Sequence, residues 1–214
     1  MTNSEILSHI DHTILKPDAK WEDVAAICAE ALQYHTASAC IPPYWVAAAH
    51  QAFPALNICT VIGFPLGYQH CSVKAAEAEL AVQQGAGEID TVINISALKS
   101  GDDDTVLQDL IRVREACPDS VLKVIIETCF LTEEEKIRCC KLVTEAEADF
   151  IKTSTGFGTA GAKLEDIALF REHIGAHVKM KAAGGIRTRE QMEAFLNAGC
   201  ERIGCSAAKI LFAE

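Results

Sequence analysis

Short β-like runs alternate with amphipathic helical runs along the whole chain, and this alternation restricts the possible folds more than any other feature. The β-like runs are short and largely apolar, and the helical runs are amphipathic and about ten to sixteen residues long. Repeated βα units predict a parallel sheet with right-handed crossovers. We expect strands at residues 11–15, 38–41, 58–64, 88–95, 122–128, 149–154, 178–184 and 202–206.

The segments between these strands have helical patterns, and several carry boundary signals. Thr132 and Thr188 are each followed three residues later by Glu or Gln, which is the pattern of a capping box. Gly85 and Gly199 stand where helices of this length end. We expect a short N-terminal helix at 3–10 and further helices at 21–34, 44–53, 72–85, 103–117, 132–147, 164–174 and 188–199.

Eight βα units that close on themselves form a (β/α)₈ or TIM barrel, and 214 residues lie near the lower end of its usual size. The predicted fold class is therefore α/β, with a single-domain (β/α)₈ barrel over residues 1–214 that carries the short N-terminal helix. A doubly wound open sheet is the structural alternative. That fold usually has a glycine fingerprint after its first strand, and "DHTILKPDA" has none.

Charge and cysteine content argue against several classes of function. The formal net charge is −11 and the pI is about 5.1, which disfavours nucleic acid or an anionic membrane as a partner. The opening residues lack the pattern of a signal peptide or membrane span, so we expect a cytoplasmic protein. The ten cysteines include no C-x-x-C pair and mostly occupy apolar patterns, so we interpret them as core residues rather than as metal ligands.

Ionisable residues lie on several expected strands, and barrels of this kind carry their active sites at the carboxyl ends of the strands. Each residue alone is more simply explained as a rim lysine, a turn residue or part of a structural polar layer. Together, three carboxylates and several lysines at one barrel mouth would be costly to desolvate without a function. These residues are Asp11, Asp90, Lys123, Glu127, Lys152 and Lys181.

Two lysines close together have a specific use in carbonyl chemistry. An amine attacks a carbonyl carbon only when neutral, and free lysine titrates near ~10.4. Desolvation and a neighbouring cation both lower a lysine pKa and so favour Schiff-base formation, with Asp90 as a candidate for moving protons. Side-chain alternation gives Lys179 and Lys181 the same orientation, so the pattern leaves open which of them lies beside Lys152.

Glycine-rich segments follow the last three expected strands and indicate an anion site. Glycine lets backbone N–H groups approach an oxyanion closely, and the loops after strands seven and eight often bind phosphate in this fold. Gly184 and Gly185, with Gly204 and Ser206 opening the final short helix, are expected to form such a cradle, and Arg187 adds positive charge. The segments read "STGFGTAG", "AAGGIRT" and "IGCSAA".

The sequence resembles the 2-deoxyribose-5-phosphate aldolase family in motifs that occur in the family's order and span nearly the whole chain. The motifs read "DHTILKPDA", "VIGFPLG", "EIDTVINI", "LKVIIETC", "DFIKTSTGFG", "KAAGGIRT" and "RIGCSAA". The resemblance implies a class I aldolase that needs no metal or other cofactor. Such an enzyme reversibly cleaves 2-deoxy-D-ribose 5-phosphate to acetaldehyde and D-glyceraldehyde 3-phosphate through a lysine Schiff base. It also implies a place in deoxyribose phosphate catabolism and a homodimer.

The family's functional residues fall on defined positions of this chain. The Schiff-base lysine of "KTSTG" falls on Lys152, and the second lysine falls on Lys181 rather than on Lys179. The aspartate of "EID" falls on Asp90 as the proton-transfer residue, and that of "DHT" falls on Asp11, which is expected to orient Lys181. The phosphate-binding positions fall on Gly156, Gly184, Gly185, Gly204 and Ser206.

Two departures from the family pattern concern the active-site mouth. Many relatives read "CVNP" where this chain reads "CIPP", so Pro42 replaces an asparagine. Some relatives end in a tyrosine that assists proton transfer, whereas the tyrosines of this chain are Tyr34, Tyr44 and Tyr68. Two alternatives remain at this stage: another Schiff-base barrel, such as a transaldolase or keto-acid aldolase, and a non-catalytic phosphosugar-binding barrel.

Overall fold

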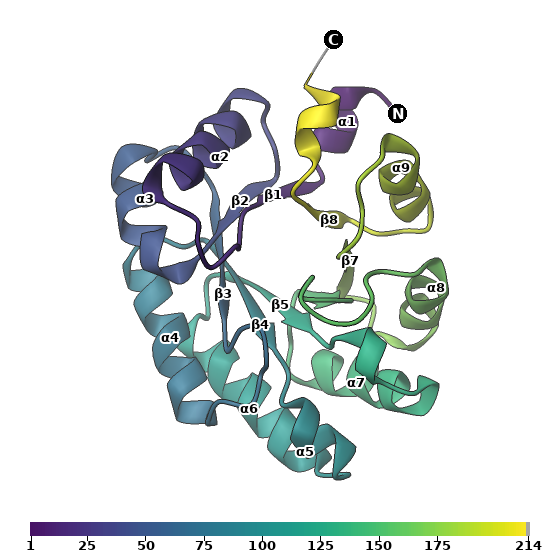
Figure 1. Ribbon diagram of the computed structural model, residues 1–214. Helices are drawn as coiled ribbons and strands as arrows, with labels where there is room; N and C mark the ends of the chain where they lie inside the picture. The colour runs from purple at the N-terminus through teal and green to yellow at the C-terminus, as the bar shows by residue number, and fades with distance from the viewer. Residues whose placement is uncertain (213–214) are drawn as a thin grey trace.

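The computed structural model describes residues 1–212, and within them eight parallel strands close into a barrel in sequential order (Figure 1). This confirms the predicted (β/α)₈ fold and excludes the open sheet. The last two residues of the predicted 1–214 domain lie outside the described residues. The strands are β1 (Ile10–Thr13), β2 (Ser38–Ile41), β3 (Ile58–Ile62), β4 (Glu88–Val92), β5 (Val121–Ile125), β6 (Phe150–Lys152), β7 (Lys179–Ala183) and β8 (Arg202–Cys205).

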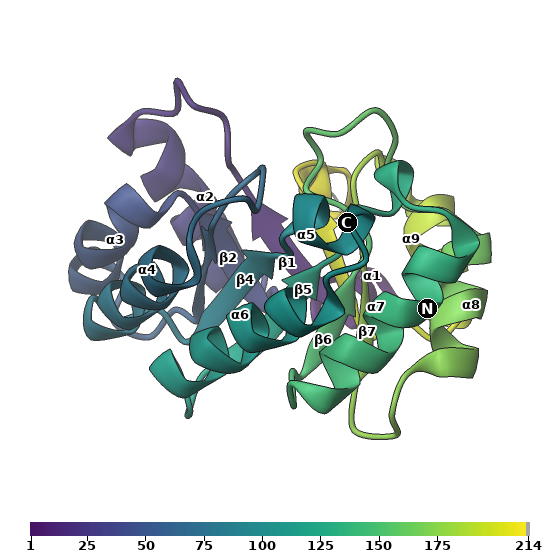
Figure 2. The same ribbon diagram turned by 90° about the horizontal axis from the view of Figure 1, so that it is seen from below.

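Helices connect successive strands and surround the barrel, as the two perpendicular views show (Figures 1 and 2). The α-helices are α1 (Asn3–Leu7), α2 (Trp21–Gln33), α3 (Val46–Ala52), α4 (Cys71–Gln83), α5 (Ile95–Lys99), α6 (Asp103–Ala116), α7 (Glu133–Glu145), α8 (Leu164–His173) and α9 (Arg189–Asn197). Short 3₁₀ helices are η1 (Pro43–Trp45), η2 (Thr128–Phe130) and η3 (Ala208–Leu211).

The strands are buried on both faces, which explains their nearly continuous apolar sequences. In β3, Ile58 and Ile62 belong to the main core that includes the helices, whereas Cys59 and Val61 belong to a smaller cluster with Cys40. Alternate residues therefore face either the surrounding helices or the barrel interior. The interior positions are the ones that can carry a site.

The predicted helix boundaries at the two capping boxes are confirmed. The side chain of Thr132 accepts a hydrogen bond from Glu135 N at 3.3 Å, and that of Thr188 accepts one from Gln191 N at the same distance. The glutamate and glutamine side chains accept hydrogen bonds from the cap backbone in return. Gly199 adopts the left-handed φ of 100° just after α9, which glycine allows without steric cost.

Several expected strands extend beyond the observed ones at the carboxyl end, and α5 was not predicted. The predicted strands continue too far at 93–95 and 126–128 for a physical reason, because Ile93 and Ile126 are still buried there. The backbone N–H of Ile93 donates to Ile125 O, and that of Ile126 donates to Lys152 O, at the ends of the neighbouring strands. Their apolar character therefore continues where the regular ladder stops. Asn94 is the N-cap of α5, and its side chain accepts from Ala97 N at 3.1 Å.

Among residues 1–212, no helix is both long enough and apolar enough to cross a membrane.

Candidate active site

The barrel interior brings two lysines from neighbouring strands onto one carboxylate oxygen. Lys152 ends β6 and stands in register with Lys181 of β7. Asp90 of β4 faces both across the interior, and its Oδ2 lies 2.7 Å from each amine nitrogen. The three predicted catalytic residues are thus joined by direct contacts, although they are separated by up to 91 positions in the sequence.

The other oxygen of Asp90 contacts a third buried lysine. Lys123 of β5 stands in register with Asp90, and its Nζ lies 2.8 Å from Asp90 Oδ1 and 2.6 Å from a carboxylate oxygen of Glu88. Lys123 lies 3.3 Å from Cys59 Sγ. Asp90 is therefore fixed from both sides by ammonium groups.

Asp11 of β1 completes the cluster on the side of Lys181. It accepts a short hydrogen bond from Lys181 Nζ, together with bonds from Ser38 Oγ at 2.7 Å and Arg202 Nη1 at 2.5 Å. Arg202 also contacts Glu88 at 2.7 Å. Buried charges are tolerated when they are paired in this way. The predicted contact between Asp11 and Lys181 is thus present.

Burial and charge act in opposite directions on the pKa values of this cluster. Burial alone would raise the pKa of Asp90, but Lys123, Lys152 and Lys181 hold it well below its ordinary value. Burial alone would lower the pKa of Lys181, but Asp11 and Asp90 raise it above the ordinary lysine value. Lys181 therefore stays cationic at neutral pH, and Asp90 stays ionised.

The two lysines of β7 have different environments, which resolves the ambiguity that alternation left open. Lys179 is the first residue of β7, is exposed, and lies 3.1 Å from the exposed carboxylate of Glu201. Lys181, two residues further along the strand, is completely buried at the level of Lys152. Both share one orientation, but Lys179 lies at the opposite end of the barrel from the mouth.

A cavity of about 580 Å³ opens at the carboxyl ends of the strands and reaches this cluster through Lys152. Of the four predicted catalytic residues, Lys152 is the one that lines the cavity, while Asp11, Asp90 and Lys181 are fully buried. The lining includes all five predicted phosphate-binding residues and two cations from the β1–α2 and β7–α9 loops. These residues are Gly156, Gly184, Gly185, Gly204, Ser206, Lys16 and Arg187.

The glycines at the cavity permit a backbone conformation that other residues rarely adopt. Gly184 and Gly185 have consecutive positive φ angles of 86° and 77°, and a side-chain carbon at Gly185 would meet only open space. The expected position of Gly204 at the start of the final helix is wrong. Gly204 does not open the final helix: it is part of β8, in register with Asp11, and η3 begins only at Ala208.

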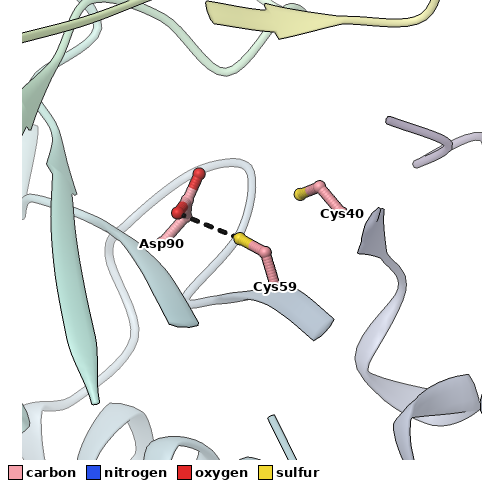
Figure 3. Close-up of side chains that lie close together, drawn as sticks. All are labelled: Cys40, Cys59 and Asp90. Carbon is pink, nitrogen blue, oxygen red and sulfur yellow. Dashed lines mark hydrogen bonds between the residues drawn. The ribbon is translucent and has the colours of Figure 1, made fainter. Parts of the chain in front are cut away.

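Cys40, Cys59 and Asp90 are close enough to be considered as a metal site, and Figure 3 shows their side chains directed toward one another. Cys59 Sγ donates to Asp90 Oδ1 at 3.2 Å. Both oxygens of Asp90 already contact ammonium groups, and Lys123 lies beside Cys59 as well. A divalent cation at this place would be repelled by these positive charges, so the donor set does not fit a resident metal.

Sequence reasoning listed Lys123 among the residues of the barrel mouth without giving it a role, and it missed Glu88 and Arg202. A usable signal was present for Glu88, because it shares strand parity with Asp90 and must also face the interior. Lys123 and Arg202 become interior partners only through the register of their strands with β4 and β7. That register is a tertiary property.

Fold and site together define a barrel enzyme with adjacent buried amines beneath a cavity suited to bind an anion, which is the arrangement of lysine-dependent aldolases. Comparison with known proteins narrows this class. A family model described as DeoC/LacD family aldolase matches residues 6–205. The chain therefore belongs to the DeoC/LacD aldolase family.

Individual relatives agree with this assignment over nearly their full lengths. A deoxyribose-phosphate aldolase of Clostridium botulinum (strain Alaska E43 / Type E3) is 55% identical over 209 residues, covering 97% of this chain and 95% of the relative. One of Clostridioides difficile (strain 630) is 51% identical over 208 residues, covering 96% and 95%. The solved structure of the tetrameric deoxyribose phosphate aldolase from Aeropyrum pernix has a TM-score of 0.90 at 29% identity, covering 99% of this chain and 92% of that one.

Proposed function

We propose that this chain reversibly cleaves 2-deoxy-D-ribose 5-phosphate to acetaldehyde and D-glyceraldehyde 3-phosphate through a Schiff base on Lys152. The observation that carries the proposal is the asymmetry of the lysine pair. Lys152 and Lys181 share one oxygen of Asp90, but only Lys152 also lines the cavity. A carbonyl carbon in the cavity is therefore accessible to Lys152, while Lys181 serves as a permanent neighbouring cation.

The reaction begins when the neutral Lys152 amine attacks the aldehyde carbon of the open-chain sugar; one proton is then taken up and water leaves, giving an iminium ion. The iminium draws electrons from the C2–C3 bond as the C3 hydroxyl loses its proton, so glyceraldehyde 3-phosphate departs and an enamine remains. Protonation of the enamine carbon and hydrolysis then release acetaldehyde and restore the amine. The iminium is the electron sink of the cleavage.

Asp90 is the proposed proton-transfer group, and Lys181 is its permanently cationic neighbour. Asp90 Oδ2 lies 2.7 Å from both amines, within the distance needed for direct transfer. Cations hold the pKa of Asp90 low, so its carboxylate is ionised in the resting site and can accept a proton in transit without retaining it. Asp11 is a positioning residue, since its carboxylate accepts from Lys181 Nζ and fixes the direction of that side chain.

The phosphate group is proposed to bind the glycine-rich loops around Gly156, Gly184, Gly185, Gly204 and Ser206. Backbone N–H groups at consecutive left-handed positions form a concave anion site. Lys16 and Arg187 line the same cavity and supply positive charge within an acidic protein. This distribution lets a phosphosugar bind despite the net charge of −11.

We also propose the extent of the catalytic domain, its independence of cofactors, its location and its assembly. Residues 1–214 act as one catalytic domain, the reaction uses no metal or other cofactor, the enzyme acts in the cytoplasm, and two copies form a homodimer. The Aeropyrum pernix relative is described as a tetramer, so the number of subunits in this protein has to be measured. Sedimentation equilibrium distinguishes a dimer from that alternative.

Trapping with borohydride tests the central step. Acetaldehyde plus borohydride should leave an N-ethyl group on Lys152, located by peptide mass spectrometry, and Lys152→Arg should abolish it because guanidinium stays protonated. The matched control is Lys179→Arg, which changes an exposed lysine of β7 and should leave the adduct intact. An adduct on another lysine, with Lys152 unmodified, contradicts the proposal.

The same experiment separates the alternatives. In a non-catalytic sugar-binding barrel, acetaldehyde plus borohydride leaves no covalent adduct, and phosphosugar binding survives the treatment. A transaldolase or keto-acid aldolase traps a ketone or keto-acid donor in preference to acetaldehyde. A screen of donors at equal concentration therefore decides between the two enzyme classes.

A further inference from the structure

Glu127 is a buried carboxylate that the proposed chemistry does not use. It lies two residues after the end of β5, is 2% exposed, and adopts a left-handed backbone conformation with φ 53°. Glutamate rarely adopts this conformation, so the surrounding structure must hold it there. In the part of the chain that the structure describes, no lysine, arginine or histidine forms an ion pair with it. A charge in this situation needs hydrogen-bond donors.

The donors come from the loop that follows Lys152. Thr155 N donates to both carboxylate oxygens of Glu127, at 3.2 and 3.3 Å, and Thr155 Oγ1 donates a short hydrogen bond to Oε2. The same hydroxyl accepts from Phe157 N at 3.0 Å. The carboxylate thus fixes Thr155 directly and Phe157 through one intermediate, with Gly156 held between them.

Glu127 lies where the backbone that follows β5 is hydrogen-bonded to the backbone at the end of β6. Ile126 N donates to Lys152 O at 3.0 Å, and Thr128 N donates to Thr153 O at 2.9 Å. Gly158, further along the same loop, lies close to this carboxylate. A side-chain carbon at position 158 would be 3.1 Å from Glu127 Cδ. The loop after β6 is therefore folded around this one side chain.

The part of the loop that Glu127 holds is the part that faces the cavity. Thr155 and Gly156 line the cavity beside Lys152 and the glycines of β7–α9. The far end of the loop is fixed separately, because Ala162 N donates to the carbonyls of Ala183 and Gly184 at 3.1 Å. Glu127 thus controls the near end, where the backbone N–H groups of the anion cradle begin.

We propose that Glu127 is a positioning residue that sets phosphate affinity through Thr155. This inference rests on the proposed function, since it assumes that the cavity binds the phosphosugar. The carboxylate does not touch the substrate. It holds the Thr155–Gly156 backbone in the shape that receives the phosphate, and its own charge is neutralised by the loop donors rather than offered to the anion.

The test compares the two sugars in a Glu127→Gln variant. An amide offers one acceptor oxygen instead of two and places donors against the donors of Thr155, so the loop shifts. We expect KM for 2-deoxyribose 5-phosphate and the inhibition constant of inorganic phosphate to rise roughly tenfold, the scale for one lost buried hydrogen bond. KM for unphosphorylated 2-deoxyribose and acetaldehyde trapping on Lys152 should change less than about twofold.

Two further variants keep the test decisive. Asp149→Asn is the matched control, because Asp149 accepts from Leu122 N at 2.8 Å just before β6, at the opposite end of the barrel from the mouth. This variant should leave the ratio of the two KM values unchanged. If Glu127→Gln fails to fold, Thr155→Val removes the hydroxyl alone and should give the same selective rise. Equal losses on both sugars, or none, overturn the inference. Absence of a Lys152 adduct in the wild type overturns the proposed function instead.

Discussion

Replacing Asp90 with asparagine removes one negative charge from the most crowded ionic cluster of the protein. The carboxylate is fully buried and contacts Lys123 at 2.8 Å and both Lys152 and Lys181 at 2.7 Å. Asparagine has nearly the same shape, so the barrel can keep its packing. Among the described residues, the change leaves Lys123 beside Glu88 and Lys181 beside Asp11, and it leaves the Lys152 amine with no carboxylate partner.

The expected loss of stability is large for a substitution of equal size. Removing one partner of a buried ion pair typically costs about 3–5 kcal/mol, because the remaining charge stays desolvated. Native domains have a free energy of unfolding of about 5–15 kcal/mol, so the variant should remain folded but be clearly weakened. Its kcat should also fall by roughly 10²-fold or more, the scale of a general acid–base group.

The pH dependence of the unfolding free energy gives a second signature. Burial acts to raise the pKa of Asp90, but the three lysines outweigh it and hold the pKa well below the ordinary value. A carboxylate with a lowered folded pKa contributes stability above its unfolded pKa of ~3.9, and this is lost as the pH falls through the folded value. The asparagine variant lacks this contribution, so its stability should fall less steeply with acid than that of the wild type.

Urea unfolding followed by circular dichroism at several pH values measures both effects. The control is Glu201→Gln, which breaks the pair with Lys179 at 3.1 Å, where both side chains are about half exposed. Exposed pairs of this kind contribute about 0–1 kcal/mol. If Asp90→Asn is within about 1 kcal/mol of the wild type at neutral pH, the cluster is not the paired buried network that these contacts describe.

Three further predictions address the phosphate loops, a helix start and the thiols. Ser206→Asp should weaken 2-deoxyribose 5-phosphate far more than unphosphorylated 2-deoxyribose, because a carboxylate in this loop repels the dianion; equal KM changes for both sugars would place the phosphate elsewhere. Thr188→Ala should lower the free energy of unfolding by about 1 kcal/mol through the lost cap of α9, as measured in urea, and no change would show that the cap is not needed. A thiol reagent such as Ellman's should modify the half-buried Cys71 and Cys129 of the folded protein first, and burial, which raises the pKa of Cys140 to about 12, should protect that thiol until unfolding; equal labelling of Cys140 contradicts the burial.

The sequence by itself was sufficient for the architecture because the relevant signals are local. The alternation of short apolar runs with amphipathic helical runs predicted the eight strands within residues 1–212, and the capping boxes at Thr132 and Thr188 placed two helix starts. The motifs around Lys152, Asp90 and Lys181 indicated the family, which the comparisons confirm. Boundaries were less accurate at the barrel mouth, because buried residues such as Ile126 continue an apolar pattern after the ladder ends.

The contacts that make the site could not be obtained from the sequence, because they depend on strand register and barrel closure. Alternation gives Lys179 and Lys181 one orientation, and only depth along the closed barrel leaves the first exposed and buries the second. The pairing of Lys123 with Asp90 joins β5 to β4, and the bond from Thr155 to Glu127 joins two loops 28 positions apart. Hydrogen bonds and ion pairs act over a few ångströms of space, whereas sequence patterns report only what lies near along the chain.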